Sequence, residues 1–151
     1  MALILKEDGY DVSMLHTEDE FVGVESWLGK KYADLPHYNV NKGDVGTSPS
    51  DILFIPEIFS QVMNQTKNLP CKRVAILQNY DYVVEQMPYS AQWGDFGILD
   101  GITNSDCQAK ELNKVFPYVK LTKVSPYISD IFGKTNDPKK MVVNIISKDQ
   151  S

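Results

Sequence analysis

Short apolar runs alternate with segments of helical spacing along the chain, and this alternation predicts its secondary structure. Continuous runs rich in branched residues predict buried strands, at residues 51–56, 73–77, 96–103 and 141–146. Weaker patterns predict three further strands, at residues 10–15, 37–40 and 119–124. Helices are predicted, mostly from apolar positions spaced three or four apart, at residues 1–7, 20–32, 57–68 and 106–116.

The order of these elements predicts an α/β fold. Strands that alternate with helices are joined by right-handed crossovers, and such crossovers produce a parallel sheet. Because the apolar runs of the central strands are unbroken, we expect these strands to be covered on both faces. We therefore predict a Rossmann-like parallel sheet with helices on both faces, in which residues 119–124 lie nearer the edge.

Polar side chains follow almost every predicted strand. In open parallel sheets, ligands bind beyond the carboxyl ends of the strands, where the connections diverge. The residues at these ends form a predicted binding site and include His16, Glu57, Gln78, Asn79, Asn104 and Ser105. A polar rim is also typical of any solvated sheet edge, so a binding site and a plain surface are both open interpretations.

Three features of this rim have a structural as well as a functional interpretation. His16 could contact a sugar hydroxyl or act as a base, or it could be a partly exposed histidine bonded to nearby backbone. Glu57 could act in catalysis, or its carboxylate could simply interact with the positive end of the helix that follows. The aromatic residues that begin at Tyr80 could stack on a sugar ring or form a packed flap.

Composition and length narrow the classes of function. The chain has 151 residues, with 15 Lys+Arg against 20 Asp+Glu and a net charge of −5, so a basic face for nucleic acid is not expected. This length suits a single domain. No apolar run approaches the roughly 20 residues that span a bilayer, so we predict no transmembrane segment. The first residues do not have the pattern of a secretory signal.

The cysteines and histidines argue against a metal site. Cys71 and Cys107 fit no zinc or redox spacing, and both lie in or beside apolar stretches. We expect them to be buried free thiols in a reducing cytosol, which predicts a cytoplasmic protein. No complete phosphate-binding loop, dinucleotide fingerprint or nucleophile elbow occurs in the sequence, and we predict neither a metal nor a cofactor.

Several short motifs occur in a fixed order over roughly residues 50–135. Pro56-Glu57 follows one predicted strand, Gln78-Asn79-Tyr80 ends the next, and a helix that begins after Ser105 leads to Phe116-Pro117. This order resembles the acceptor-side, N-terminal half of GT-B glycosyltransferases, including rhamnosyltransferase-like members, which act in polysaccharide or cell-surface glycan synthesis. The resemblance implies a cleft that binds a glycan or sugar acceptor, with Glu57 as the catalytic candidate. The residues implied to contact substrate are His16, Gln78, Asn79, Tyr80, Asn104 and Ser105.

The resemblance also implies that parts of the family fold are missing. A strand and a glycine-bearing loop precede the first helix in the family, whereas residues 1–12 resemble the end of that helix and the second strand. We expect residues 1–135 to form the acceptor-side domain. Residues 136–151 would be a linker and the start of a truncated donor-side domain. A nucleotide-sugar would bind only with the missing domain, so the chain alone is expected to be inactive.

A non-catalytic α/β module that binds a small ligand or a protein is the alternative function. The absence of the family's first strand and donor-side half favours it. An unpaired sheet edge at the place of that strand would favour a homodimer.

Overall fold

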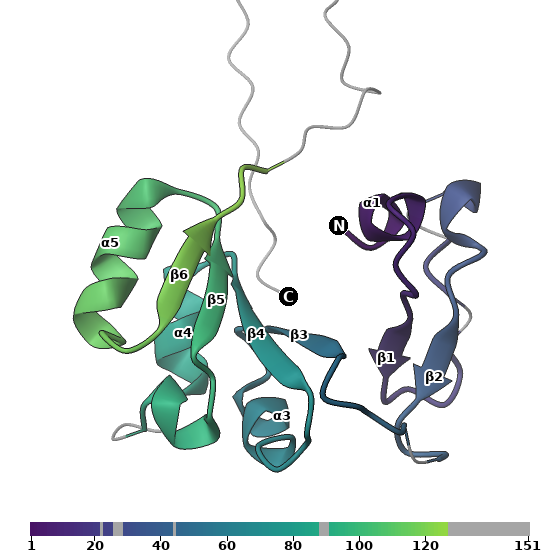
Figure 1. The fold of residues 1–151 in the computed structure, drawn as a ribbon, viewed down its shortest axis with the longest axis horizontal. Coiled ribbons are helices and arrows are strands. Elements are labelled where there is room, and N and C mark those ends of the chain that lie inside the picture. Colours follow the sequence, from purple (N-terminus) through teal and green to yellow (C-terminus); the bar gives the residue numbers. More distant parts are fainter. Residues whose placement is uncertain (22, 26–28, 44, 88–90, 127–151) are drawn as a thin grey trace, which may run out of the picture.

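The computed structural model describes residues 1–21, 23–25, 29–43, 45–87 and 91–126. The helices in these ranges are α1 (Ala2–Glu7), η1 (Lys30–Tyr32), α3 (Ser60–Gln65), α4 (Tyr80–Gln86), η2 (Trp93–Phe96) and α5 (Asp106–Val115). The strands are β1 (Met14–His16), β2 (His37–Asn39), β3 (Ile52–Pro56), β4 (Lys72–Leu77), β5 (Asp100–Thr103) and β6 (Lys120–Lys123). All strand pairs are parallel, and the predicted α/β class is confirmed (Figure 1).

The larger sheet contains β3, β4, β5 and β6 side by side in sequence order. In its centre Ala75 of β4 lies opposite Gly101 of β5, which lies opposite Leu121 of β6. A Cβ atom on Gly101 would come within 2.8 Å of the Leu121 side chain and 3.1 Å of the Leu77 side chain. The glycine therefore allows these two leucines to approach each other across β5.

The hydrophobic core lies on one face of this sheet. Side chains alternate between the two faces of a strand, and the core takes alternate residues of β3 and β4. It also takes buried residues from each of α3, α4 and α5, so these three helices cover the same face. The core residues from these five elements include Ile55, Ala75, Leu77, Met63, Val83 and Leu112, and the partly buried Leu53 packs against them.

The opposite face of the larger sheet is also apolar. Its side chains include Ile52, Phe54, Val74, Ile76 and Ile102, and none of them belongs to the core cluster. Val74 is buried, whereas Phe54, Ile76 and Ile102 are only partly buried and Ile52 is 53 % exposed. Helices α3, α4 and α5 do not cover this second apolar face, because they pack on the first.

The two shorter strands form a separate sheet. β1 pairs with β2, and His16 lies opposite Asn39 at the carboxyl end of the pair. The Lys6 side chain of α1 donates a hydrogen bond to the Asp34 carbonyl, at 2.7 Å, and so connects α1 to the chain that enters β2. In Figure 1, β1 lies between β2 and the larger sheet. The sequence predicted parallel strands but not their division between two sheets.

Glycine conformation explains where the predicted elements differ from the observed ones. A helix was expected over residues 20–32, but Gly23 and Gly29 have φ values of 97° and 103°, which an α-helix cannot contain. A strand was expected over residues 96–103, but Gly97 has a φ of 69° and ends η2, and β5 begins only at Asp100. The predicted strand at 141–146 and the domain boundary at 135 lie outside the described residues.

Candidate functional site

The carboxyl ends of β3, β4 and β5 bring together most of the residues predicted for the site. Because the three strands are parallel and adjacent, the residues that follow them lie along one edge of the sheet. This edge, which we call the carboxyl rim, carries Glu57, Gln78, Asn79, Asn104 and Ser105. The parallel register thus confirms their proximity, whereas their role in binding or catalysis stays a prediction.

Glu57 connects β3 to the end of β4. Its side chain is buried, with 3 % exposure, and its Oε1 accepts hydrogen bonds from the amides of Gln78 at 3.0 Å and Asn79 at 2.9 Å. The Glu57 amide in turn donates to the Ile76 carbonyl at 2.9 Å. Without this oxygen, the two amides would lose the acceptor that they have in the turn between β4 and α4. The described contacts give Glu57 a structural function, and its catalytic role remains a prediction.

Asn79 and Tyr80 mark the start of α4. Asn79 is the N-cap residue of this helix, and its side-chain oxygen accepts from the Asp81 amide at 3.0 Å. Tyr80 is the first residue of α4, and its side chain lies outside the described part of the structure. Gln78 is exposed, and its carbonyl accepts from the Asn104 side-chain amide at 3.3 Å. This bond connects the ends of β4 and β5.

Ser105 begins α5 and completes the rim. It is the N-cap residue, and its Oγ accepts from the Gln108 amide at 3.2 Å. The buried Gln108 side chain accepts from the Asn104 amide at 3.2 Å and from the hydroxyl of buried Thr103. The sequence analysis did not predict Thr103 or Gln108, although Ser105 and Gln108 have the spacing of a capping box. Their bonds fix the backbone from which Asn104 extends.

Replacement of Ser105 by alanine should lower the free energy of unfolding by about 1 kcal/mol, because the Gln108 amide loses its cap acceptor. Urea unfolding of the full chain measures this change. Ser105→Asp, which retains an acceptor, should restore most of the loss, and Ser13→Ala at an exposed position serves as the control. Equal stability of Ser105→Ala and the original chain would contradict a capping role.

His16 does not join the carboxyl rim. It ends β1 in the smaller sheet, and no described hydrogen bond or ring contact connects it with a rim residue. Its Nδ1 lies 3.0 Å from the Glu18 carbonyl and its ring stacks on Phe21 with centroids 4.3 Å apart. This corresponds to the structural alternative of a histidine bonded to nearby backbone. Its predicted contact with substrate stays untested.

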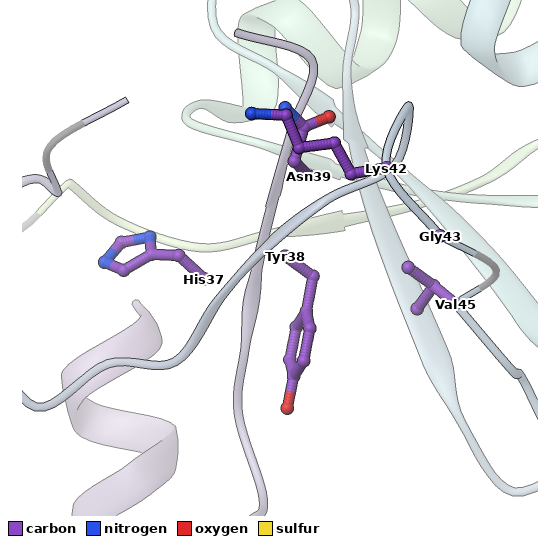
Figure 2. A pocket seen from close by; sticks show the side chains of 6 residues that line it. All are labelled: His37, Tyr38, Asn39, Lys42, Gly43 and Val45. Atoms are coloured by element: carbon purple, nitrogen blue, oxygen red, sulfur yellow. The ribbon is translucent and has the colours of Figure 1, made fainter. Parts of the chain in front are cut away.

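A hollow of about 320 Å³ lies at β2 and the loop that follows (Figure 2). Its lining residues are His37, Tyr38, Asn39, Lys42, Gly43 and Val45. The Lys42 ammonium and the Asn39 amide are both bound to the Asp19 carboxylate, at 3.2 Å each. The His37 ring points away from Tyr38 and Val45 (Figure 2). The Lys42 ammonium of this hollow is already paired, and no predicted site residue lines the hollow. We therefore place the candidate site at the carboxyl rim.

The described residues contain no group of three His, Cys, Asp or Glu side chains that could hold a metal ion. Both cysteines are free, and Cys71 is buried as predicted. Cys107 is exposed on α5, which corrects the expectation that both thiols would be buried. Its neighbour Gln108 takes the inward-facing position of this helix turn. No helix in the described ranges is long and apolar enough to cross a membrane.

Comparison with known proteins gives no relative from which a role could be transferred. No protein-family model, curated protein or solved structure matches this chain.

Proposed function

We propose that this chain is the acceptor-side half of a cytoplasmic glycosyltransferase of the GT-B type, and that its carboxyl rim binds a sugar or glycan acceptor. The observation that carries the proposal is the position of Gln78, Asn104 and Ser105 along one edge of a parallel sheet. That edge is where α/β folds of this kind bind their ligands. The order of short motifs between residues 50 and 135 supports the family.

The rim offers the hydrogen-bonding groups that sugar hydroxyls need. Gln78 has an exposed side-chain amide, which can donate and accept. Asn104 donates to the Gln78 carbonyl, so its side-chain oxygen is directed by that bond and can accept from a hydroxyl. Ser105 Oγ accepts from Gln108, which leaves its own proton for a ligand oxygen. Together these groups form a neutral surface suited to an uncharged polyol.

Saccharide binding can be tested by ligand-observed NMR with the full chain and a panel of mono- and oligosaccharides. We expect at least one saccharide to give saturation transfer, and Gln78→Ala and Asn104→Ala each to weaken its binding about 2- to 10-fold, the effect of one lost hydrogen bond. The matched controls are Asn64→Ala and Gln65→Ala, exposed residues of α3 that do not belong to the rim. No signal from any saccharide, or equal loss in the controls, would overturn the proposal.

Sugar transfer by this chain alone is expected to be undetectable. Transfer requires stabilisation of the departing diphosphate, and the family resemblance assigns that function to the donor-side domain. In addition, the rim carboxylate Glu57 is buried and accepts two backbone amides. Turnover of a nucleotide-sugar by the purified chain would contradict this expectation.

A non-catalytic α/β module that binds a small ligand or a protein is the second candidate function. Glu57 is the one carboxylate that was predicted as a catalytic residue, and its Oε1 already accepts hydrogen bonds from the Gln78 and Asn79 amides. This structural function of Glu57 favours a module without catalytic activity. Binding of a non-saccharide ligand that depends on Gln78 and Asn104 would support this function over the first.

A further inference from the structure

Gln108 has a buried side-chain amide whose orientation is fixed by its contacts. The residue lies in the first turn of α5 and is 3 % exposed. Its Oε1 accepts hydrogen bonds from the Asn104 backbone amide, at 3.2 Å, and from the hydroxyl of buried Thr103. A backbone amide can only donate, so the atom that faces Asn104 must be the oxygen of the Gln108 side chain. Its Nε2 is therefore the other polar end of the group.

The Nε2 atom of Gln108 is a donor without an acceptor. None of the hydrogen bonds between the described residues uses this nitrogen, although polar groups of buried side chains are normally paired. Nε2 is also not among the fully buried unpaired nitrogens of the described residues, which belong to His37 and Trp93. It therefore keeps contact with solvent. Because Nε2 and Oε1 share one carbon atom, Nε2 lies close to the Asn104 backbone and so to the carboxyl rim.

Ser105 places a second donor on the same turn of α5. Its Oγ accepts from the Gln108 backbone amide at 3.2 Å, which leaves the hydroxyl proton for a ligand. Side chains three residues apart lie on the same face of a helix, so the Ser105 hydroxyl and Gln108 Nε2 are neighbours. The start of a helix also carries a partial positive charge. This pair of donors therefore favours an oxygen atom with partial negative charge.

A carbonyl oxygen suits these two donors. It has two lone pairs and no proton of its own, so it can accept from both donors at once, whereas a hydroxyl must also place its proton. A carboxylate is a weaker match, because the neighbouring Lys123 is already paired with Asp106. An anionic ligand would find no unpaired cation beside these donors within the described residues. The expected ligand group is neutral and contains a carbonyl.

We propose that Ser105 and Gln108 bind the carbonyl oxygen of an acetamido group, so that the carboxyl rim prefers 2-acetamido sugars to sugars with a hydroxyl at that carbon. This inference rests on the proposed function, since it places the carbonyl on a saccharide bound at the rim. Asn104 supplies the complementary acceptor. Its side-chain nitrogen donates to the Gln78 carbonyl, which leaves its oxygen to accept from the acetamido N–H.

Ligand-observed NMR of the full chain with matched saccharides tests this preference. We expect N-acetylglucosamine or N-acetylgalactosamine to bind at least 5-fold more tightly than glucose or galactose, respectively, because the acetamido group adds hydrogen bonds. Gln108→Glu keeps an oxygen for Asn104 and Thr103 and retains a capping box with Ser105. It replaces Nε2 by a second oxygen, which repels a carbonyl, so the preference should be lost. The matched control is Gln65→Glu, the same change at an exposed position of α3.

The possible results separate this inference from the proposed function. If no saccharide binds, the proposed function fails and the inference fails with it. Suppose instead that saccharides bind in dependence on Gln78 and Asn104. Equal affinity for glucose and N-acetylglucosamine, or a preference that Gln108→Glu retains, then overturns the inference alone. Tighter binding of glucuronic acid than of N-acetylglucosamine would assign the donors to a carboxylate and would also overturn it.

The side-chain amide signals of Gln108 provide a second measurement if Gln108→Glu does not fold. In the original chain these signals should shift when N-acetylglucosamine is added, because Nε2 gains an acceptor. The side-chain amide signals of Gln65 should stay in place and serve as the control. Gln108 signals that do not move on binding of the sugar would overturn the inference.

Discussion

Replacement of Glu57 by alanine should lower the free energy of unfolding by about 2–6 kcal/mol, because each backbone amide left without an acceptor costs about 1–3 kcal/mol. Two amides are affected, those of Gln78 and Asn79, which donate to Glu57 Oε1 at 3.0 and 2.9 Å. The site is 3 % exposed, so little solvent is available to replace the lost acceptor. Urea unfolding of the full chain, with the midpoint and slope measured separately, gives the change.

Two further variants separate the hydrogen bonds from the charge and from general effects of substitution. Glu57→Gln keeps Oε1 as an acceptor and should cost less than half as much as the alanine variant. Glu111→Ala removes an exposed carboxylate whose pKa is lowered by its hydrogen bond and charge interaction with Lys114, and it should not measurably change stability. If Glu57→Ala is as stable as the original chain, the carboxylate does not connect β3 to β4 in solution.

Replacement of Trp93 by alanine should cost about 3–5 kcal/mol of unfolding free energy, the range for a buried aromatic residue. Trp93 has 0 % exposure and belongs to the core cluster beneath the sheet. Its ring stacks on Phe116 with centroids 4.4 Å apart and planes 4° from parallel, so truncation would also remove this contact. Thermal and urea unfolding measure the loss, and Tyr118→Ala at an 86 % exposed position is the control.

Trp93→Phe tests which part of the indole contributes. The Trp93 Nε1 atom is buried and has no hydrogen-bond partner in the described part of the structure. Phenylalanine would keep an aromatic ring against Phe116 and remove that unpaired donor, so we expect a loss of less than half that of the alanine variant. A loss as large as that of Trp93→Ala would contradict this expectation.

The sequence predicts well those elements whose apolar residues follow a single clear pattern, either a continuous apolar run or helical spacing. β3, β4 and α5 lie close to their expected positions, because a buried parallel strand and an amphipathic helix have distinct patterns. The gathering of polar residues at the carboxyl rim was also predictable, since it follows from parallel strand direction alone. Pairing between distant strands leaves no such pattern, so the division into two sheets was not predicted.

The start of α4 and the contacts of Glu57 depend on local backbone geometry, which the spacing of apolar residues does not reveal. α4 begins at Tyr80 and contains aromatic and β-branched residues, which have low helix propensity, and its best signal was the N-cap residue Asn79. The bridging function of Glu57 was missed because a helix start at this position also explains a carboxylate. In the structure α3 begins only at Ser60, so Glu57 lies outside the helix and its side chain reaches the end of the next strand.

The sequential order of β3, β4, β5 and β6 has a consequence for how the chain folds. Each of these strands pairs with its immediate neighbour along the chain, so each contact closes a short loop and carries a small loop-closure entropy. Low contact order of this kind favours rapid folding, so amides of residues 52–123 should acquire protection from hydrogen exchange early in refolding.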